Sequence, residues 1–376
     1  MNRTASVLAA ALALGSLTAC GDKVDESQST NFTVAATDDA CTVSGAEATT
    51  GTSTFEVTNN GEKTTEFYVY TSGGRVVGEV ENIGPGATRK LVVQITDPGD
   101  YTLTCKPGMV GDGFSQTLKV TGEAVEASTD EVLTQAVDGY ISYVRSQTTA
   151  LQGQVDAFVA AIESDDIDTA KELFPLARTP YERIEPVAES FPNDLDPRID
   201  LREADIQEGD TWSGFHKIEK DLWVNKKITD ETKADAAQLK QDIAELVDGV
   251  AADDYTLAPV QIASGAQGLL DEIATSKITG EEDIFSHTDL YDFQANLDGS
   301  RAAIASLEKA LNERDPQLLT DINERFDAVQ TLLDAYREGD GFVSYDKVSQ
   351  EERRELSDAL DVLTEKVSTV QEVVAS

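Results

Sequence analysis

The chain has 376 residues, which is enough for two domains that each bury a core. Apolar residues make up 40% of it, a composition that excludes an intrinsically disordered protein. Its 70 acidic and 30 basic residues give a formal net charge of −40, which argues against nucleic acid and anionic membrane surfaces as partners. The charge suits a protein that handles cations, although a solvated acidic surface would account for most of it.

The first 20 residues predict an export signal. Arg3 gives a short basic start, the apolar run 7–14 is too short to span a membrane, and Leu17-Thr18-Ala19-Cys20-Gly21 resembles a bacterial lipobox. We expect cleavage before Cys20 and its acylation, which would anchor the protein to the outer face of the cytoplasmic membrane through a polar tether at 21–30. The alternative is ordinary signal cleavage. Either way, the mature chain is exported to the cell envelope or periplasmic space.

Residues 31–122 carry the pattern of a small β-sandwich. Short alternating or β-rich runs are separated by turn sequences such as Asn59-Asn60-Gly61 and Gly84-Pro85-Gly86. The seven predicted strands cover residues 32–36, 53–58, 66–70, 75–80, 88–95, 101–105 and 116–120.

After a short linker at 123–130, the apolar period becomes helical and strand signals almost disappear. Helices are predicted at about 131–164, 166–173, 178–191, 211–224, 230–251, 256–277, 290–313, 316–338 and 350–373. Residues 131–376 therefore predict an all-α, up-and-down helical bundle, the second domain of a multidomain protein.

One predicted helix, at 211–224, carries polar groups on an aromatic face. At helical spacing, His216 and Glu219 fall on the same stripe as Trp212, Phe215 and Trp223. A buried carboxylate needs a partner, and a metal ion would satisfy both polar side chains. The alternative is a His-Glu hydrogen bond within a core.

A second predicted helix, at 178–191, also places acids on or beside an apolar face. Glu185 shares the stripe of the apolar residues, and Glu182 lies at its edge, which suits a bound cation. The alternative is that Glu182 and Glu189 pair with Arg178 and Arg183 on the surface. The acidic loop at 194–202 follows, and its Asp200 either reaches the same interior or remains solvated.

The β-region resembles the cupredoxin family through residues 54–61, 66–69, 84–86 and 101–105. In that resemblance, Cys105 and Met109 take the positions of copper ligands. The two histidines of a blue-copper centre are missing, and Glu66 stands where the first would be. Two possibilities remain open: a modified metal site of Cys41, Glu66, Cys105 and Met109, or a disulfide between the two cysteines.

The helical region resembles the imelysin family, and the whole chain resembles the EfeO-type iron-uptake lipoproteins. The matching motifs are residues 181–186, 212–219 with Leu222-Trp223, and 277–290 leading to 292–296; within them, Gly214, His216 and Glu219 preserve a Gly-x-His-x-x-Glu pattern. The resemblance implies an extracytoplasmic protein that binds ferrous or ferric iron and serves a membrane iron permease and a secreted haem-type peroxidase. It implies His216 and Glu219 as metal ligands.

The same resemblance implies further acidic contributors, which are Glu182, Glu185 and the pair Glu281-Glu282. It also implies an accessory metal or oxidation site for copper or iron in the β-domain, and zinc is a further candidate metal. A ferroxidase is therefore one alternative function. A metallopeptidase is another, but Lys220 follows Glu219 where a His-x-x-Glu-His zinc motif would have its second histidine.

Overall fold

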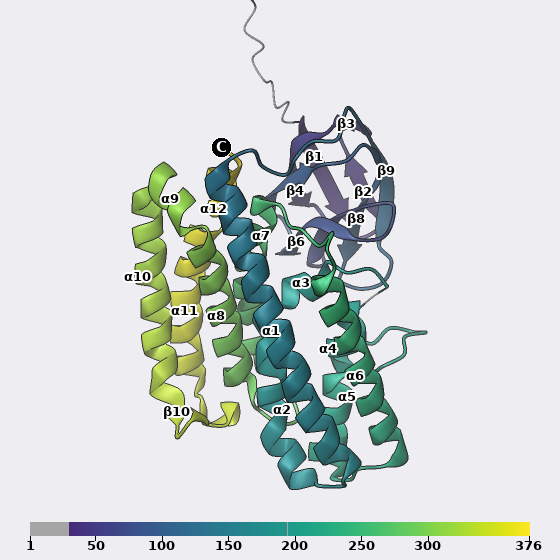
Figure 1. Ribbon diagram of the computed structural model, residues 1–376, viewed down its shortest axis with the longest axis vertical. Helices are drawn as coiled ribbons and strands as arrows, with labels where there is room; N and C mark the ends of the chain where they lie inside the picture. Colours follow the sequence, from purple (N-terminus) through teal and green to yellow (C-terminus); the bar gives the residue numbers. More distant parts are fainter. Residues whose placement is uncertain (1–29, 194) are drawn as a thin grey trace, which may run out of the picture.

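The computed structural model describes residues 30–193 and 195–376. The predicted export signal, Cys20 and residues 21–29 of the predicted tether lie outside the described residues. A β-sandwich sits at one end of a longer helical domain (Figure 1), so the predicted order of the two folds is confirmed. Within the described ranges, no helix has both the length and the apolar character needed to cross a bilayer.

The sandwich has two sheets with strand orders β2-β1-β4-β7 and β3-β9-β8-β5-β6. Its strands are β1 Thr30–Thr37, β2 Ala40–Val43, β3 Glu47–Thr49, β4 Gly51–Asn59, β5 Thr65–Tyr70, β6 Val76–Ile83, β7 Thr88–Ile95, β8 Gly99–Pro107 and β9 Phe114–Thr121. All seven predicted strands are present, and the short strands β2 and β3 were missed. Alternate residues of β4 are buried, so each sheet turns one face toward the shared core.

A disulfide joins the two sheets of the sandwich. Cys41 on β2 is bonded to Cys105 on β8, 64 residues further along the chain. This bond decides between the two possibilities that the sequence left open, in favour of the disulfide.

The helical domain begins with a long helix and ends near the sandwich. Its helices are α1 Glu131–Glu163, α2 Ile167–Glu182, α3 Glu185–Glu189, α4 Leu195–Asp200, α5 Phe215–Lys220, α6 Asp230–Ala251, α7 Pro259–Glu272, α8 Asp289–Ser306, α9 Glu308–Arg314, α10 Pro316–Leu333, α11 Gln350–Val367 and α12 Val370–Ala375. Helix α1 packs against α2 and α6, while α8 packs against α2 and α7. A small hairpin of β10 Arg337–Glu338 and β11 Gly341–Phe342 interrupts the helices.

Several predicted helices differ from the structure, and two of them carry candidate site residues. The one at 178–191 is divided, because α2 continues to Glu182 and α3 starts anew at Glu185 with Pro186 in its first turn. The one at 211–224 starts only at Phe215, because Gly214 has a φ of 84°, outside the right-handed helical region. Trp212 therefore precedes the helix, and its indole N–H donates to the carbonyl of Leu201 at 2.7 Å.

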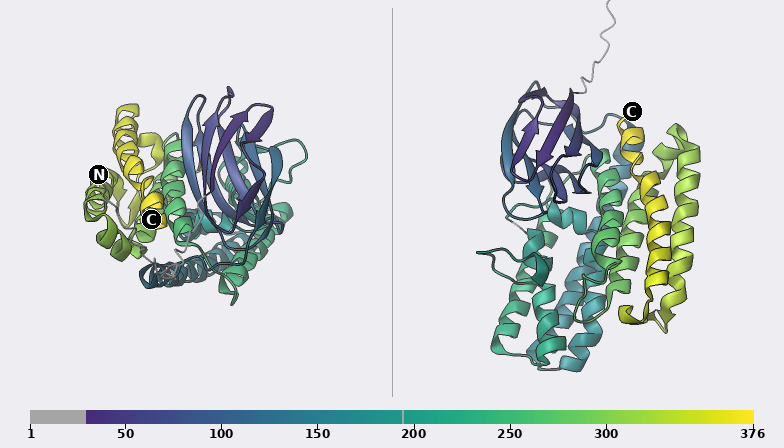
Figure 2. Two further views of the ribbon diagram at one scale, coloured as in Figure 1. Left: turned by 90° about the horizontal axis from the view of Figure 1, so that it is seen from above. Right: turned by 180° about the vertical axis from the view of Figure 1, so that it is seen from behind.

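The two domains share an interface in which α7 and α12 meet β6 and β7 (Figure 2). Arg89 of β7 is paired with Asp271 of α7 at 2.8 Å. The amide of Val92 donates to the Gln371 side chain of α12 at 3.3 Å, and the Val92 side chain belongs to the helical core. Apolar packing and polar contacts thus both connect the sandwich to the bundle.

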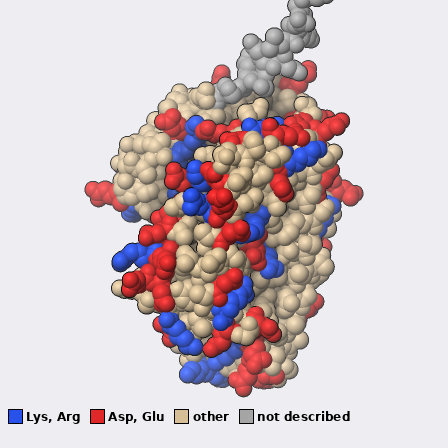
Figure 3. All heavy atoms as spheres, turned by 90° about the vertical axis from the view of Figure 1, so that its left-hand side faces the viewer, with Lys and Arg blue, Asp and Glu red and all other residues tan. Residues whose placement is uncertain are grey.

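Acidic and basic side chains are interspersed over the face drawn in Figure 3. This distribution is that of a solvated charged surface. The acids that require a separate explanation are those inside the helical domain.

Candidate metal centre

A cluster of charged side chains lies within the helical core. Its buried acids are Glu182, Glu185, Asp200, Glu219, Glu282, Asp283, Asp289 and Asp292, and its buried basic residues are Arg178, Lys277 and His216. Acids outnumber bases in this cluster. Because buried charges are costly unless they are paired, the surplus favours an additional cation.

A turn before α5 brings Asp200 and His216 together. A Cβ on Gly214 would lie 2.1 Å from the carbonyl oxygen of Ile199, so only glycine permits this approach. The hydroxyl of Ser213 donates to the carbonyl of Arg198 at 2.9 Å, which adds a second link between the turn and α4. As a result, the end of α4 and the first turn of α5 present Asp200 and His216 to each other.

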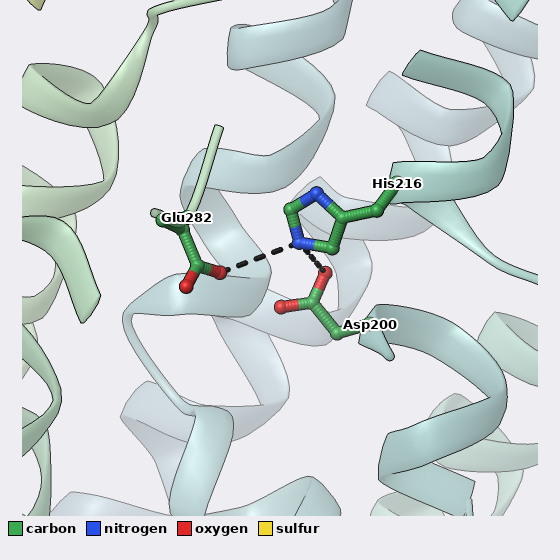
Figure 4. A group of neighbouring side chains, drawn as sticks. All are labelled: Asp200, His216 and Glu282. Carbon is green, nitrogen blue, oxygen red and sulfur yellow. Dashed lines mark ion pairs between the residues drawn. The ribbon is translucent and has the colours of Figure 1, made fainter. Parts of the chain in front are cut away.

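The two ring nitrogens of His216 face different carboxylates. Nε2 lies 3.5 Å from Asp200 Oδ1 and 3.4 Å from Glu282 Oε1 (Figure 4), and it has no hydrogen-bond partner among the described residues. Nδ1 lies 3.2 Å from Glu219 Oε2. Burial and Arg178 would lower the pKa of His216, but Asp200, Glu219 and Glu282 outweigh them and raise it to about 10.

The Nε2 side of His216 fits a small metal ion. One possible ligand atom from each of His216, Asp200 and Glu282 lies within 4.8 Å of the other two, and all three residues are buried. Ligands about 2.1 Å from a common ion are separated by about 3.0–3.4 Å, close to the spacings seen here. Small movements of these side chains would therefore complete a three-residue site.

Glu219 serves both His216 and the loop that carries Glu282. Its Oε1 accepts from the backbone N–H groups of Phe285 at 3.1 Å and Ser286 at 2.7 Å, while Oε2 faces His216. Such a carboxylate typically orients a metal-binding imidazole from the opposite ring nitrogen. Asp283 also approaches Nδ1, so His216, Glu219 and Asp283 form a second possible group of ligands.

Glu182 and Glu185 both point into the cluster, as the resemblance implied for them. Glu182 was expected at the edge of its helix, but it is fully buried, and Lys277 Nζ lies 3.4 Å from its Oε2. Glu185 is 6% exposed, and its Oε2 lies 3.8 Å from Lys277 Nζ. The expected alternative of a surface pair between Glu182 and Arg178 is also wrong, because the two side chains do pair but inside the core.

The sequence did not predict five further members of the cluster, which are Arg178, Lys277, Asp283, Asp289 and Asp292. Arg178 lies one helical turn before Glu182, and this spacing is the signal that would have placed both on one side of α2. On α8, the buried polar residues Asp289, Asp292, Asn296 and Ser300 follow helical spacing. A polar stripe on a helix that must pack on several sides indicates a buried polar network.

The pKa values of two acids in the cluster, Glu282 and Asp292, are shifted in opposite directions. Burial would raise the pKa of Glu282, but Lys277, His216 and Arg202 outweigh it and hold that pKa well below its usual range. Burial raises the pKa of Asp292 well above its usual range despite the nearby Arg178. Glu282 therefore remains an anion ready to hold a cation, whereas Asp292 favours its protonated form.

The β-domain does not bring its four candidate ligands together as a metal site. Cys41 and Cys105 are consumed in the disulfide and supply no thiolate, which corrects the expectation of a site formed with Glu66 and Met109. Glu66 is 7% exposed, and the Tyr68 hydroxyl lies 3.1 Å from its Oε2. Glu66 and Met109 instead line a cavity of about 250 Å³ between the domains, opposite Glu189 and Asp196.

Comparison with known families now identifies the fold of the bundle. The family model described as Imelysin matches residues 136–370, more than half of the chain. The chain belongs to the imelysin family. In this imelysin-family protein, a second model, described as Cupredoxin-like domain, matches residues 6–115. The expected combination of the two domains is confirmed.

Relatives of this imelysin-family protein align with much of its length. An "Efem/EfeO family lipoprotein" of Staphylococcus haemolyticus is 47% identical over 239 residues, which cover 63% of this chain and 82% of that one. The "Iron uptake system component EfeO" of Escherichia coli (strain K12) is 36% identical over 348 residues, which cover 91% of this chain and 90% of that one. The chain is therefore a member of the EfeO type.

Proposed function

We propose that this protein is the extracytoplasmic iron-binding component of an iron uptake system. The observation that carries the proposal is the buried Nε2 of His216, which lacks a hydrogen-bond partner among the described residues and faces Asp200 and Glu282. The names of the relatives, an iron uptake system component and a lipoprotein, agree with this role.

The chemistry of the donors suits iron. One imidazole and several carboxylates form a hard, oxygen-rich ligand set of the kind that favours iron over cuprous copper. His216, Asp200 and Glu282 would bind the ion directly, Glu219 would orient the imidazole, and Glu182 and Glu185 would add negative charge or further oxygens. Zinc and cupric ions are competitors for the same donors.

The partners and location follow from this role. Acylation at Cys20 would keep the protein at the outer face of the cytoplasmic membrane, where a membrane iron permease would receive the ion. A haem-type peroxidase of the same system would be the second partner. An accessory copper or iron site, if the β-domain has one, would use the cavity beside Glu66 and Met109 and would have no cysteine ligands.

A ferroxidase would require a redox centre, and the disulfide removes the Cys105 thiolate that the cupredoxin resemblance implied, together with that of Cys41. A peptidase would require that a polypeptide reach the metal. His216 is 1% exposed and Glu282 is 3% exposed, so the candidate site admits an ion much more readily than a peptide bond. Both observations favour transport over enzymatic activity.

The test is metal binding by the mature full-length protein after its metal has been stripped. Ferric iron (supplied as a weak chelate), anaerobic ferrous iron, zinc and copper would be titrated by calorimetry. The wild type should bind iron, and His216→Ala, Asp200→Asn and Glu282→Gln should lose that binding while they remain folded by circular dichroism. Glu208→Gln is the control, because it removes an exposed acid outside the cluster.

A folded His216→Ala variant with wild-type iron stoichiometry would contradict the proposal. Iron binding that depends on Glu66 and not on His216 would move the main site to the interdomain cavity.

A further inference from the structure

Arg178 occupies the middle of the acidic cluster. Its side chain is fully buried, and its guanidinium lies 5.4 Å from the ring centre of Phe215. Its carboxylate partners come from four separate segments of the chain and are Glu182, Asp200, Glu282, Asp283 and Asp292. A buried arginine that pairs with so many candidate ligands is placed to influence every cation that binds there.

The guanidinium and the proposed iron ion share the same oxygen atoms. Asp200 Oδ1 accepts a hydrogen bond from Arg178 Nη1, and it is also the atom 3.5 Å from His216 Nε2. Glu282 Oε1 lies 2.9 Å from Arg178 Nη2 and 3.4 Å from His216 Nε2. An ion on these two oxygens must therefore share them with Arg178 or displace it.

The charge of Arg178 is permanent. A guanidinium does not deprotonate in proteins, so the binding of an ion cannot be accompanied by loss of this charge. Repulsion between neighbouring buried cations is weakly screened and grows with the charge of the ion. Lys277 does not compete for the Glu282 oxygen that faces His216, because its Nζ lies 3.4 Å from the other oxygen, Oε2.

We propose that Arg178 sets the affinity and the release rate of the metal site, an inference that rests on the proposed function. Before an ion binds, the guanidinium holds Asp200, Glu182 and Glu282 together and offsets their mutual repulsion. Once an ion is bound, the same guanidinium competes for the shared oxygens. The affinity of the site is thereby kept low enough for the ion to be passed to a membrane partner. Repulsion from the guanidinium lowers the affinity for trivalent ions more than that for divalent ions.

The decisive variant is Arg178→Met combined with Asp292→Asn. Methionine preserves much of the apolar stem, and Asp292→Asn removes one acid that pairs with Arg178 at 3.2 Å. Asp292 belongs to a third group of possible ligands, with Glu182 and Glu282, so the effect of Asp292→Asn alone must be measured separately. The double change removes the guanidinium together with one of the acids that pairs with it, so fewer buried carboxyl groups lose a partner. Asp292→Asn alone and Arg325→Met, at an exposed arginine, are the controls.

The measurements are the dissociation constant from competition with a chelator and the first-order release rate, for ferric iron and for zinc. The double variant should bind ferric iron at least about tenfold more tightly and release it correspondingly more slowly, with a smaller change for zinc. Arg178→Lys should fall between the wild type and the double variant, because an ammonium keeps the charge but has one donor centre for both oxygens.

Two failures can be distinguished. If the wild type binds no iron, the proposed function fails. If the wild type binds iron and the folded double variant binds it equally well or more weakly, Arg178 only supports the fold and the further inference is overturned. An Arg178→Lys variant that binds as tightly as the double variant would also overturn it, because charge would then not be the determinant.

Discussion

At the residue scale, the site depends on which carboxylates the two ring nitrogens of His216 face. Glu219 takes Nδ1 and is itself held by two backbone N–H groups, so the imidazole has little freedom to turn. Nε2 is left toward Asp200 and Glu282. Helical spacing in the sequence already paired His216 with Glu219, but it assigned Glu219 as a ligand and did not distinguish the two nitrogens.

Proton release should accompany metal binding. The pKa of His216 is raised from 6.5 to about 10 in the folded protein, so the imidazole is protonated at neutral pH before metal binds. An ion on Nε2 must displace that proton, so affinity should rise with pH up to about pH 10. Calorimetry with zinc at pH 7, in buffers of different ionisation enthalpy, should count about one proton released per zinc ion bound by the wild type; binding without proton release would contradict this.

The same raised pKa makes a prediction for the metal-free protein. Because the folded pKa lies above the unfolded one, the stabilisation from protonated His216 is complete below about pH 6.5 and is lost as pH rises through about 10. Urea unfolding of the metal-free wild type should show a steeper loss of stability over this range than His216→Gln. Parallel pH profiles would show that His216 does not gain a proton on folding.

Glu219→Gln should weaken metal binding by about 10–100-fold without abolishing it. The amide that replaces the carboxylate has one oxygen, which cannot both accept from the two loop N–H groups and face Nδ1 of His216. Competition with a chelator would measure the change, with Glu208→Gln as the control. Complete loss of binding would indicate instead that Glu219 is a direct ligand.

At the element scale, the turn between α4 and α5 decides which residues meet. Sequence periodicity extended the second helix back to residue 211, because it records the side chains that repeat but not the backbone conformation of a single glycine. The structure starts α5 at Phe215 and places the turn against the end of α4. Asp200, the acid assigned to a loop, reaches the site for this reason.

Gly214→Ala should destabilise the protein by about 2 kcal/mol or more, because it adds a backbone clash to the strain of a positive φ. Gly209→Ala is the matched control, since Gly209 also has a positive φ (108°) but no atom within 4 Å of an added Cβ. It should cost about 1 kcal/mol. Denaturant unfolding compares the two, and equal losses would mean that contact with Ile199 is unimportant. Gly214→Ala should also weaken metal binding.

At the scale of the whole molecule, the sandwich and the bundle are coupled by contacts that neither domain could form alone. Arg89 reaches from β7 to Asp271 on α7, whose side chain is 8% exposed. The neighbouring Lys90 pairs with Glu372 on α12, where both side chains are about half exposed. The two pairs therefore differ mainly in burial.

Arg89→Ala should cost about 1–3 kcal/mol, because it leaves the Asp271 carboxylate buried, with the Gln267 amide as its remaining side-chain donor among the described residues. Lys90→Ala should change the unfolding free energy by less than about 1 kcal/mol, as is usual for an exposed ion pair. Calorimetric unfolding should show the two domains less well coupled in Arg89→Ala. Identical transitions for the two variants would mean that the Arg89 pair does not stabilise the interface.

Local patterns in the sequence predict the two fold classes, their order, and the residue types of the site. Alternation and helical periodicity follow from local geometry, and the motif around His216 lies within one helical turn. Tertiary structure alone decided that Cys41 and Cys105 form a bond, that Asp200 and Glu282 face Nε2, and that Arg178 and Lys277 lie inside the core. These outcomes depend on groups far apart in the chain, and on a surplus of buried charge that only packing brings to one place.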